Sequence, residues 1–179
     1  GCKKGFLLKD LNILLPGIKS YGIENHSYAL KHAVKCKSKL ILTDYTKLPF
    51  KNKSLDFVIA FNSLYMQNLG DVIKSLKEIE RVSKKSYIVL ASGENDKERN
   101  KFYKWTLIGT SILLKREWRQ LFRKIKFNGD YYFSSAKSLG VWFINNVKNF
   151  IKIMRLADYV INFLEKKKIK TVFTVSGGG

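Results

Sequence analysis

Two apolar runs separated by one helical pattern most constrain the fold of this chain. DFVIA, Asp56 to Ala60, and SYIVLAS, Ser86 to Ser92, carry apolar side chains at consecutive rather than alternate positions. Consecutive apolar side chains are typical of strands buried on both faces, as in a parallel sheet. The segment that begins at Asp71 lies between them and places apolar residues at helical spacing. The order strand, helix, strand predicts a βαβ unit.

The segments on both sides of this unit continue the alternation. The first expected helix is stopped by Pro16 and Gly17, and Ser27 is the expected N-cap of the second. We expect helices over residues 5–15, 27–34, 71–82, 93–106 and 116–127 and strands over residues 20–24, 40–43, 56–60, 86–92 and 129–134. The predicted fold class is therefore α/β, a parallel sheet with helices on its faces.

Composition sets further bounds. The chain has 179 residues, of which 45% are hydrophobic, enough for one main domain with an ordinary core. Cys2 and Cys36 lie far apart and near no histidine cluster, so we expect neither a disulfide nor a metal site. The longest apolar run is shorter than the ~20 residues that span a bilayer. We expect a cytoplasmic protein without a membrane span, and nothing in the sequence sets its oligomeric state.

The charge leaves a nucleic-acid function open. The chain carries 34 Lys and Arg against 14 Asp and Glu, a net charge of +20. Clustered basic residues neutralise phosphates, and Tyr131, Tyr132 and Phe133 could stack on bases. Most lysines are scattered singly, however, as on a solvated surface, and the aromatic residues fit an ordinary strand. A basic RNA-binding module is thus the alternative, and we do not expect a nucleic-acid partner.

Acidic residues end two of the predicted strands. Glu24 follows the first strand about 20 residues after the glycines of GCKKG, and Asp44 follows the second. Ligands of open parallel sheets bind at the carboxyl ends of the strands, where a carboxylate can accept hydrogen bonds from a ribose. Spacing alone leaves two interpretations open: a nucleoside-binding pair, or loop acids that only end strands.

An ordered set of motifs carries a family resemblance. YGIE, LTDYTKLPF, KSLDFVIAFNSLY and LKEIERVSKKSYIVLAS follow one another over about residues 1–134. In this order they resemble the class I S-adenosylmethionine-dependent methyltransferases of the small-molecule type, in particular bacterial enzymes encoded among surface-polysaccharide genes. The resemblance implies a Rossmann-like methyltransferase sheet, S-adenosyl-L-methionine as cofactor and a small-molecule acceptor, such as a sugar or a polysaccharide precursor.

The resemblance also assigns a glycine loop. GCKKG would be the remnant of a GCGKG-type loop, with Gly1, Lys3 and Gly5 beside the methionine part of the cofactor. Lys3 stands where the family has its middle glycine, so its side chain could crowd the cofactor. The family's first strand is expected to be missing before Gly1. This loss would expose sheet edges, so an inactive methyltransferase-like shell is a further alternative.

Four other positions complete the implied site. Glu24 would bind the ribose hydroxyls, Asp44 the adenine amine, and Tyr45 would lie beside the adenine ring. Asn62, with Ser63 next to it, would face the methyl group that is transferred. The resemblance assigns no catalytic residue, because the sulfonium is already activated and methyl transfer depends mainly on positioning.

The last residues carry a second resemblance. MRLADYVINFLEKKKIKTVFTVSGGG, from Met154 to Gly179, is similar to the start of thiamine-diphosphate-dependent enzymes of the acetolactate synthase type. Thiamine diphosphate would bind only the full-length enzyme of that family, not this segment. The expected organisation is a methyltransferase domain over residues 1–140, a linker over 141–153 and a fragment over 154–179. A fusion fragment without activity of its own is therefore another alternative.

Overall fold

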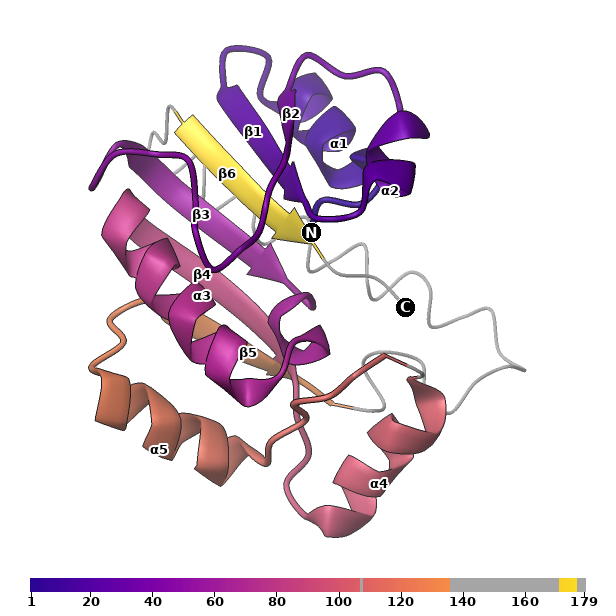
Figure 1. The fold of residues 1–179 in the computed structure, drawn as a ribbon, viewed down its shortest axis with the longest axis vertical. Coiled ribbons are helices and arrows are strands. Elements are labelled where there is room, and N and C mark those ends of the chain that lie inside the picture. Colours follow the sequence, from indigo (N-terminus) through magenta and orange to yellow (C-terminus); the bar gives the residue numbers. More distant parts are fainter. Residues whose placement is uncertain (107, 136–170, 177–179) are drawn as a thin grey trace.

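A single parallel sheet organises the described part of the molecule (Figure 1). The computed structural model describes residues 1–106 and 108–135 and the backbone of residues 171–176. The strands are β1 (Lys19–Glu24), β2 (Lys39–Leu42), β3 (Leu55–Phe61), β4 (Ser83–Ala91), β5 (Asp130–Ser134) and β6 (Thr171–Ser176). Their order across the sheet is β2-β1-β6-β3-β4-β5, with every neighbouring pair parallel. The α/β parallel fold class is confirmed.

The helices connect these strands. They are α1 (Phe6–Leu14), α2 (Ser27–Lys31), the 3-10 turn η1 (Leu64–Met66), α3 (Leu69–Val82), α4 (Asp96–Trp105) and α5 (Lys115–Ile125). Side-chain caps fix two of the starts: Asn68 Oδ1 accepts from the Asp71 N–H, and Asn95 Oδ1 accepts from the Glu98 N–H. Such caps satisfy backbone donors that have no partner inside the helix.

The second helix differs from its prediction in start and length. Its N-cap is His26, so the prediction of Ser27 as the cap was wrong, and α2 ends at Lys31. The expected continuation to Val34 fails because the Val34 N–H donates to the Lys4 carbonyl at 2.8 Å instead of continuing the helix. A tertiary hydrogen bond to the glycine loop therefore replaces the local helical pattern.

Alternate residues of β3 point into two separate apolar clusters. Val58 and Ala60 pack in the larger cluster with residues of α3 and α5, whereas Phe57 and Ile59 pack with Leu11 of α1. Since successive side chains of a strand point to opposite faces, α1 and α3 cover opposite faces of the sheet. The continuous apolar run of β3 is therefore explained by burial on both sides.

The central position of the sheet is taken by β6. Its residues pair with β1 on one side, Tyr21 with Phe173, and with β3 on the other, Ile59 with Thr174. Figure 1 shows β6, in yellow, between these two strands. The expectation of exposed edges at a missing strand was therefore wrong, because β6 pairs with both edges.

The proposed division of the chain stays a prediction. The linker over 141–153 and the helix expected after Met154 lie outside the described residues. Of the segment 154–179, the structure describes β6, which belongs to the same sheet as β1 to β5.

Candidate functional site

The GCKKG segment forms a tight turn before α1. The Cys2 N–H donates to the Ile23 carbonyl at 2.6 Å, and the Gly5 N–H donates to the Cys2 carbonyl at 2.9 Å. Lys3 and Gly5 both adopt left-handed backbone angles, with φ of 49° and 79°. Glycine reaches this region at little cost, whereas a lysine with a Cβ is strained there. The turn thus has the geometry that a glycine at position 3 would suit better.

Glu24 is the centre of the polar contacts at this turn. Its Oε2 accepts from the Lys3 N–H at 2.8 Å, and its Oε1 accepts from the N–H groups of Asn25 and His26 at 3.0 and 3.1 Å. The Tyr45 hydroxyl donates to Oε1 at 3.3 Å and to Asn25 Oδ1 at 3.1 Å. The structure therefore brings Lys3, Glu24 and Tyr45 together at the carboxyl end of β1.

Two glycines make this close approach possible. A Cβ added at Gly1 would lie 1.9 Å from Glu24 Oε2, and one added at Gly22 would lie 2.5 Å from the Leu8 side chain and 2.7 Å from Cys2 Sγ. A Cβ at either position would require these neighbouring side chains to move. The glycine at position 1 lets the backbone touch the carboxylate, and Gly22 lets the turn pack on β1.

Glu24 is only 4% exposed, and burial is the largest cause of the pKa shifts of Cys2 and Tyr45 beside it. Burial raises the pKa of the Cys2 thiol to about 11. The pKa of Tyr45 is raised well above its usual range, first by burial and then by the Glu24 charge. None of the ion pairs among the described residues includes Glu24.

Asp44 directly precedes Tyr45 in the sequence, but its described hydrogen bonds are not made with the Glu24 cluster. It is exposed, and its Oδ1 accepts from the Thr46 N–H and from the Thr46 hydroxyl, both at 2.7 Å. These bonds stabilise the turn after β2, which is joined to β1 where the Thr43 N–H donates to the Glu24 carbonyl at 3.0 Å. The described hydrogen bonds of Asp44 use one carboxylate oxygen, and a role of this residue toward a ligand amine stays a prediction.

Asn62 stands at the carboxyl end of β3 with an unusual combination of features. It is 5% exposed, its φ is 48°, and its N–H donates to the Val89 carbonyl at 3.0 Å. Its side-chain Oδ1 is buried and has no hydrogen-bond partner among the described residues. A buried acceptor without a donor costs about 1–3 kcal/mol, so a bound donor would stabilise the site.

The segment that follows Asn62 contacts the loop between α4 and α5. The N–H groups of Thr110 and Ser111 donate to the Tyr65 carbonyl at 3.0 and 2.9 Å, and both hydroxyls donate to the Gln67 carbonyl at 2.6 Å. These bonds join the loop after β3 to the loop between α4 and α5. The side-chain Nε2 of Gln67 is a second buried polar atom without a partner in the described residues.

The ion pair of Arg81 and Glu78 holds the loop that contains the LPF motif, residues 48–50. Arg81 donates to Glu78 through Nε at 2.6 Å and Nη2 at 2.7 Å, and to the carbonyls of Leu48 and Phe50 at 3.0 and 2.9 Å. Glu78 Oε2 in turn accepts from the Leu48 N–H at 2.8 Å. The hydrogen bonds to Arg81 hold the pKa of Glu78 below its usual range. The pair fixes the loop that follows Tyr45.

Sequence reasoning did not identify Asn25 or the clamp of Arg81 on the LPF loop. Asn25 directly follows Glu24, and this adjacency was the available signal for its contact with Tyr45. The contact between Arg81 and Leu48 joins residues 33 positions apart, which no local pattern reveals.

The described residues offer neither a helix that could span a membrane nor a metal centre. No helix among them is long and apolar enough to cross a membrane. Across residues 1–106, 108–135 and 171–176, no group of three His, Cys, Asp or Glu side chains is placed to hold a metal ion.

Solved structures of known proteins share the fold. A methyltransferase of Haloferax volcanii, solved in complex with the Trm112 methyltransferase activator, is 20% identical with a TM-score of 0.59, and the match covers 70% of this chain and 57% of that one. The YcgJ protein of Bacillus subtilis is 16% identical with a TM-score of 0.57, covering 70% and 58%. A SAM-dependent methyltransferase of Methanosarcina mazei is 18% identical with a TM-score of 0.52, covering 70% and 76%.

The chain therefore spans less than three fifths of the length of the first two structures. No curated protein sequence matches it. The family model of the methyltransferase domain matches residues 1–90, half of the chain, and includes the GCKKG turn, Glu24, Tyr45 and Asn62. The chain belongs to the methyltransferase domain family.

Proposed function

We propose that this chain is an S-adenosylmethionine-dependent methyltransferase domain acting on a small molecule. The observation that carries the proposal is Glu24, a buried carboxylate at the carboxyl end of β1 whose described neighbours include no Lys or Arg in an ion pair. The described donors to Glu24 are three backbone N–H groups and the Tyr45 hydroxyl, all neutral, and vicinal ribose hydroxyls would supply two more donors of this kind. The domain family is the context that makes an adenosyl ligand the natural candidate.

The chemical groups at this site suit S-adenosylmethionine. Backbone without a side chain lies beside the carboxylate at Gly1, and the Asn62 Oδ1 acceptor has no partner in the described structure. Tyr45 makes the longest of the contacts to Glu24, at 3.3 Å, and its hydroxyl also donates to Asn25. A ribose hydroxyl would replace this contact, after which Tyr45 would keep its bond to Asn25.

Each residue has one task in this proposal. Glu24 would hold the ribose, Asp44 the adenine amine and the GCKKG backbone the methionine part, while Asn62 would face the reacting end. S-adenosylmethionine supplies an activated methyl group, so the protein needs to position the acceptor rather than to activate the donor. No residue is assigned as a base.

The acceptor would bind beside the loop after β3, which begins at Asn62. Hydrogen bonds from Thr110 and Ser111 to Gln67 support this location because they hold that loop in place. A sugar or a precursor of a surface polysaccharide is our proposal for the acceptor, and it rests on the sequence resemblance alone.

The test is calorimetric titration of S-adenosylhomocysteine into the full chain and two variants. Glu24→Gln removes the charge with little change in shape, and Asp10→Asn removes an exposed carboxylate of α1 as a matched control. We expect micromolar binding by the parent chain and by Asp10→Asn, and binding at least tenfold weaker by Glu24→Gln, since hydrogen bonds to a charged group contribute about 1.5–3 kcal/mol.

Circular dichroism of each variant separates lost binding from lost folding. If the folded parent chain binds no S-adenosylhomocysteine, or if Glu24→Gln and Asp10→Asn bind equally well, the proposed cofactor site is wrong.

A further inference from the structure

A second pocket lies at the opposite end of β1 from Glu24. It has a volume of about 510 Å³, and its described lining residues are Gly17, Ile18, Lys19, Ser20, Tyr21, Lys37 and Lys39. Five residue steps at about 3.3 Å each separate Lys19 from Glu24 along the strand. The pocket is thus distinct from the proposed cofactor site, and its function does not depend on the proposed methyltransferase activity.

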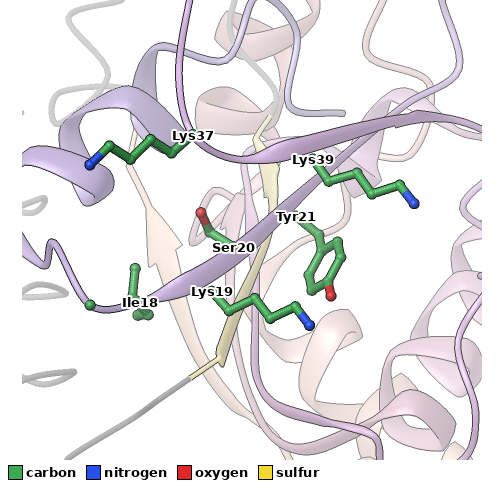
Figure 2. Close-up of a pocket in the computed structure, with 7 residues that line it drawn as sticks. Ile18, Lys19, Ser20, Tyr21, Lys37 and Lys39 are labelled. Carbon is green, nitrogen blue, oxygen red and sulfur yellow. The ribbon is translucent and has the colours of Figure 1, made fainter.

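Two lysines and a tyrosine share one face of this pocket. Tyr21 pairs with Lys39 across the β1 and β2 ladder, and Lys19 is two positions before Tyr21 on the same strand. Residues two apart on a strand and directly paired residues point to the same face. Figure 2 shows the side chains of Lys19, Tyr21 and Lys39 on one side of β1, with that of Lys37 on the other.

The tyrosine in this group is held from two sides. Its ring packs edge-on against Phe50 of the LPF loop, with centroids 5.3 Å apart. The Lys19 ammonium lies 5.9 Å from the centre of the Tyr21 ring, within the range of a cation–π contact. The positions of Lys19 and Tyr21 are therefore partly organised without a ligand.

A polar network fixes the backbone beneath the lysines. Ser20, which is 5% exposed, has its hydroxyl 2.6 Å from that of Ser38 and accepts from Asn12 Nδ2 at 2.9 Å. Asn12 Oδ1 accepts from the Ser38 hydroxyl and from the Lys37 N–H, at 3.0 and 2.9 Å. This network ties α1, β1 and the residues before β2 together, so the three lysines are carried on an ordered frame.

The charge of the pocket is uncompensated. The ion pairs among the described residues use Lys74, Arg81, Lys84, Arg99 and Lys115, and none includes Lys19, Lys37 or Lys39. The described lining of the pocket includes no carboxylate, so a multivalent anion bound there would be attracted by Lys19 and Lys39 together. Lysine binds phosphate as a compact point charge, and a tyrosine hydroxyl can add one hydrogen bond.

We propose that this pocket binds a compact phosphate-bearing anion, with the Lys19 and Lys39 ammonium groups as charge partners and the Tyr21 hydroxyl as an additional donor. A compact anion is favoured over a nucleic-acid strand because Lys19 and Lys39 line one pocket on the same face of the sheet. A strand would instead require basic residues that follow a line along the surface.

The test uses inorganic pyrophosphate as the probe, titrated into the full chain by calorimetry at 0.05 and 0.15 M NaCl. The variant Lys19→Gln/Lys39→Gln removes two charges from the pocket. Lys97→Gln/Lys104→Gln removes two exposed charges from α4 and matches its net charge. We expect saturable binding at one site, a loss of at least tenfold in the pocket variant and a change below twofold in the α4 variant.

Backbone amide chemical shifts of the parent chain give a readout that needs no variant. During the same titration, the amides of Lys19, Tyr21 and Lys39 should shift with one common dissociation constant, while those of α4 stay in place. Non-saturable binding, an equal loss in both double variants, or shifts spread over the whole basic surface would overturn the proposal. So would tighter binding of a single-stranded oligothymidylate of about eight nucleotides through the same lysines.

Discussion

Glu24 and Glu78 are two carboxylates that each hold a loop after a strand, and they differ in what surrounds their charge. Glu24 accepts from three backbone N–H groups and the Tyr45 hydroxyl. Glu78, with a side chain 18% exposed, accepts from Arg81 twice and from the Leu48 N–H. The first charge is buried without an ion-pair partner among the described residues, and the second is paired.

The difference distinguishes a carboxylate that stabilises a loop from one that is available to bind a ligand. The Glu78 and Arg81 pair stabilises the LPF loop whether or not a ligand is present, because each group already satisfies the other. Glu24 holds its loop through weaker, neutral donors, and its contact with Tyr45 can be exchanged for a ligand hydroxyl. A buried charge of this kind costs stability that ligand binding can recover.

The largest expected effect concerns the strand that joins the two regions. Within the sheet, β6 pairs on one side with β1, which ends at Glu24. On its other side it pairs with β3, the strand that precedes the helix α3 with Glu78. Thr174→Pro removes a backbone donor from this central strand and should lower the free energy of unfolding by about 3 kcal/mol or more in urea titrations. Thr174→Ala keeps the N–H and serves as control; equal stability of the two variants would show that β6 is not paired on both sides.

The next effect should appear in the paired region. Arg81→Leu leaves Glu78 and the Leu48 and Phe50 carbonyls without their donor. We expect a loss of about 2 kcal/mol in the free energy of unfolding, moderated because the Arg81 side chain is 34% exposed and water replaces part of its bonds. Glu78→Gln should lower the free energy of unfolding by less in the Arg81→Leu variant than it does in the parent chain. Strict additivity of the two changes would contradict the coupling.

The pH dependence of stability should distinguish the regions. The pKa of Cys2, beside Glu24, is raised to about 11, so above pH 9 the unfolded chain loses a proton that the folded chain keeps. Stability should then fall by about 1 kcal/mol per pH unit between pH 9 and 11. The pKa of Glu78 is lowered, so its contribution is present above pH 4.5 and is lost as the pH falls through the folded-state pKa.

Urea midpoints from pH 3 to 11 measure both effects. Cys2→Ala should reduce the alkaline loss and leave the acid loss, whereas Glu78→Gln should do the reverse. If either substitution alters both limbs equally, the two regions do not titrate independently.

The smallest effect tests the strain in the GCKKG turn. Lys3 has a φ of 49°, and Lys3→Gly relieves about 1 kcal/mol of left-handed strain while adding chain entropy to the unfolded state. We expect a net gain of about 0.5 kcal/mol in stability and tighter binding of S-adenosylhomocysteine. Lys126→Gly, at another left-handed lysine with φ of 54°, should give the gain in stability without the gain in affinity.

The sequence allowed the prediction of most elements but not of their long-range pairing. Periodicity identified β3 and β4, because burial on both faces leaves a continuous apolar run. It could not reveal that Thr171–Ser176 pairs with β1 about 150 residues earlier, because strand pairing is non-local. The positive φ of Lys3 was equally hidden, since the residue type argues against it.

The candidate site could be predicted only in part, because local sequence patterns do not reveal tertiary contacts. Strand ends are local features, so Glu24 could be placed at the carboxyl end of β1, whereas Asn62 was assigned through the family resemblance. The hydroxyl contact between Tyr45 and Glu24 depends on tertiary packing, and Tyr45 was expected only beside an adenine ring. Its cofactor role and those of Asp44 and Asn62 stay predictions.

The most direct test of the distinction between the two carboxylates is the stabilisation that S-adenosylhomocysteine gives to each variant. Urea unfolding is measured with and without ligand at 100 times the parent dissociation constant, where a ligand adds about 2.7 kcal/mol. We expect this full increase in the parent chain and in Glu78→Gln, although the latter is less stable, and an increase of at most about 1.4 kcal/mol in Glu24→Gln, which corresponds to binding at least tenfold weaker. A full increase in Glu24→Gln, or an equal loss in both variants, would contradict the account.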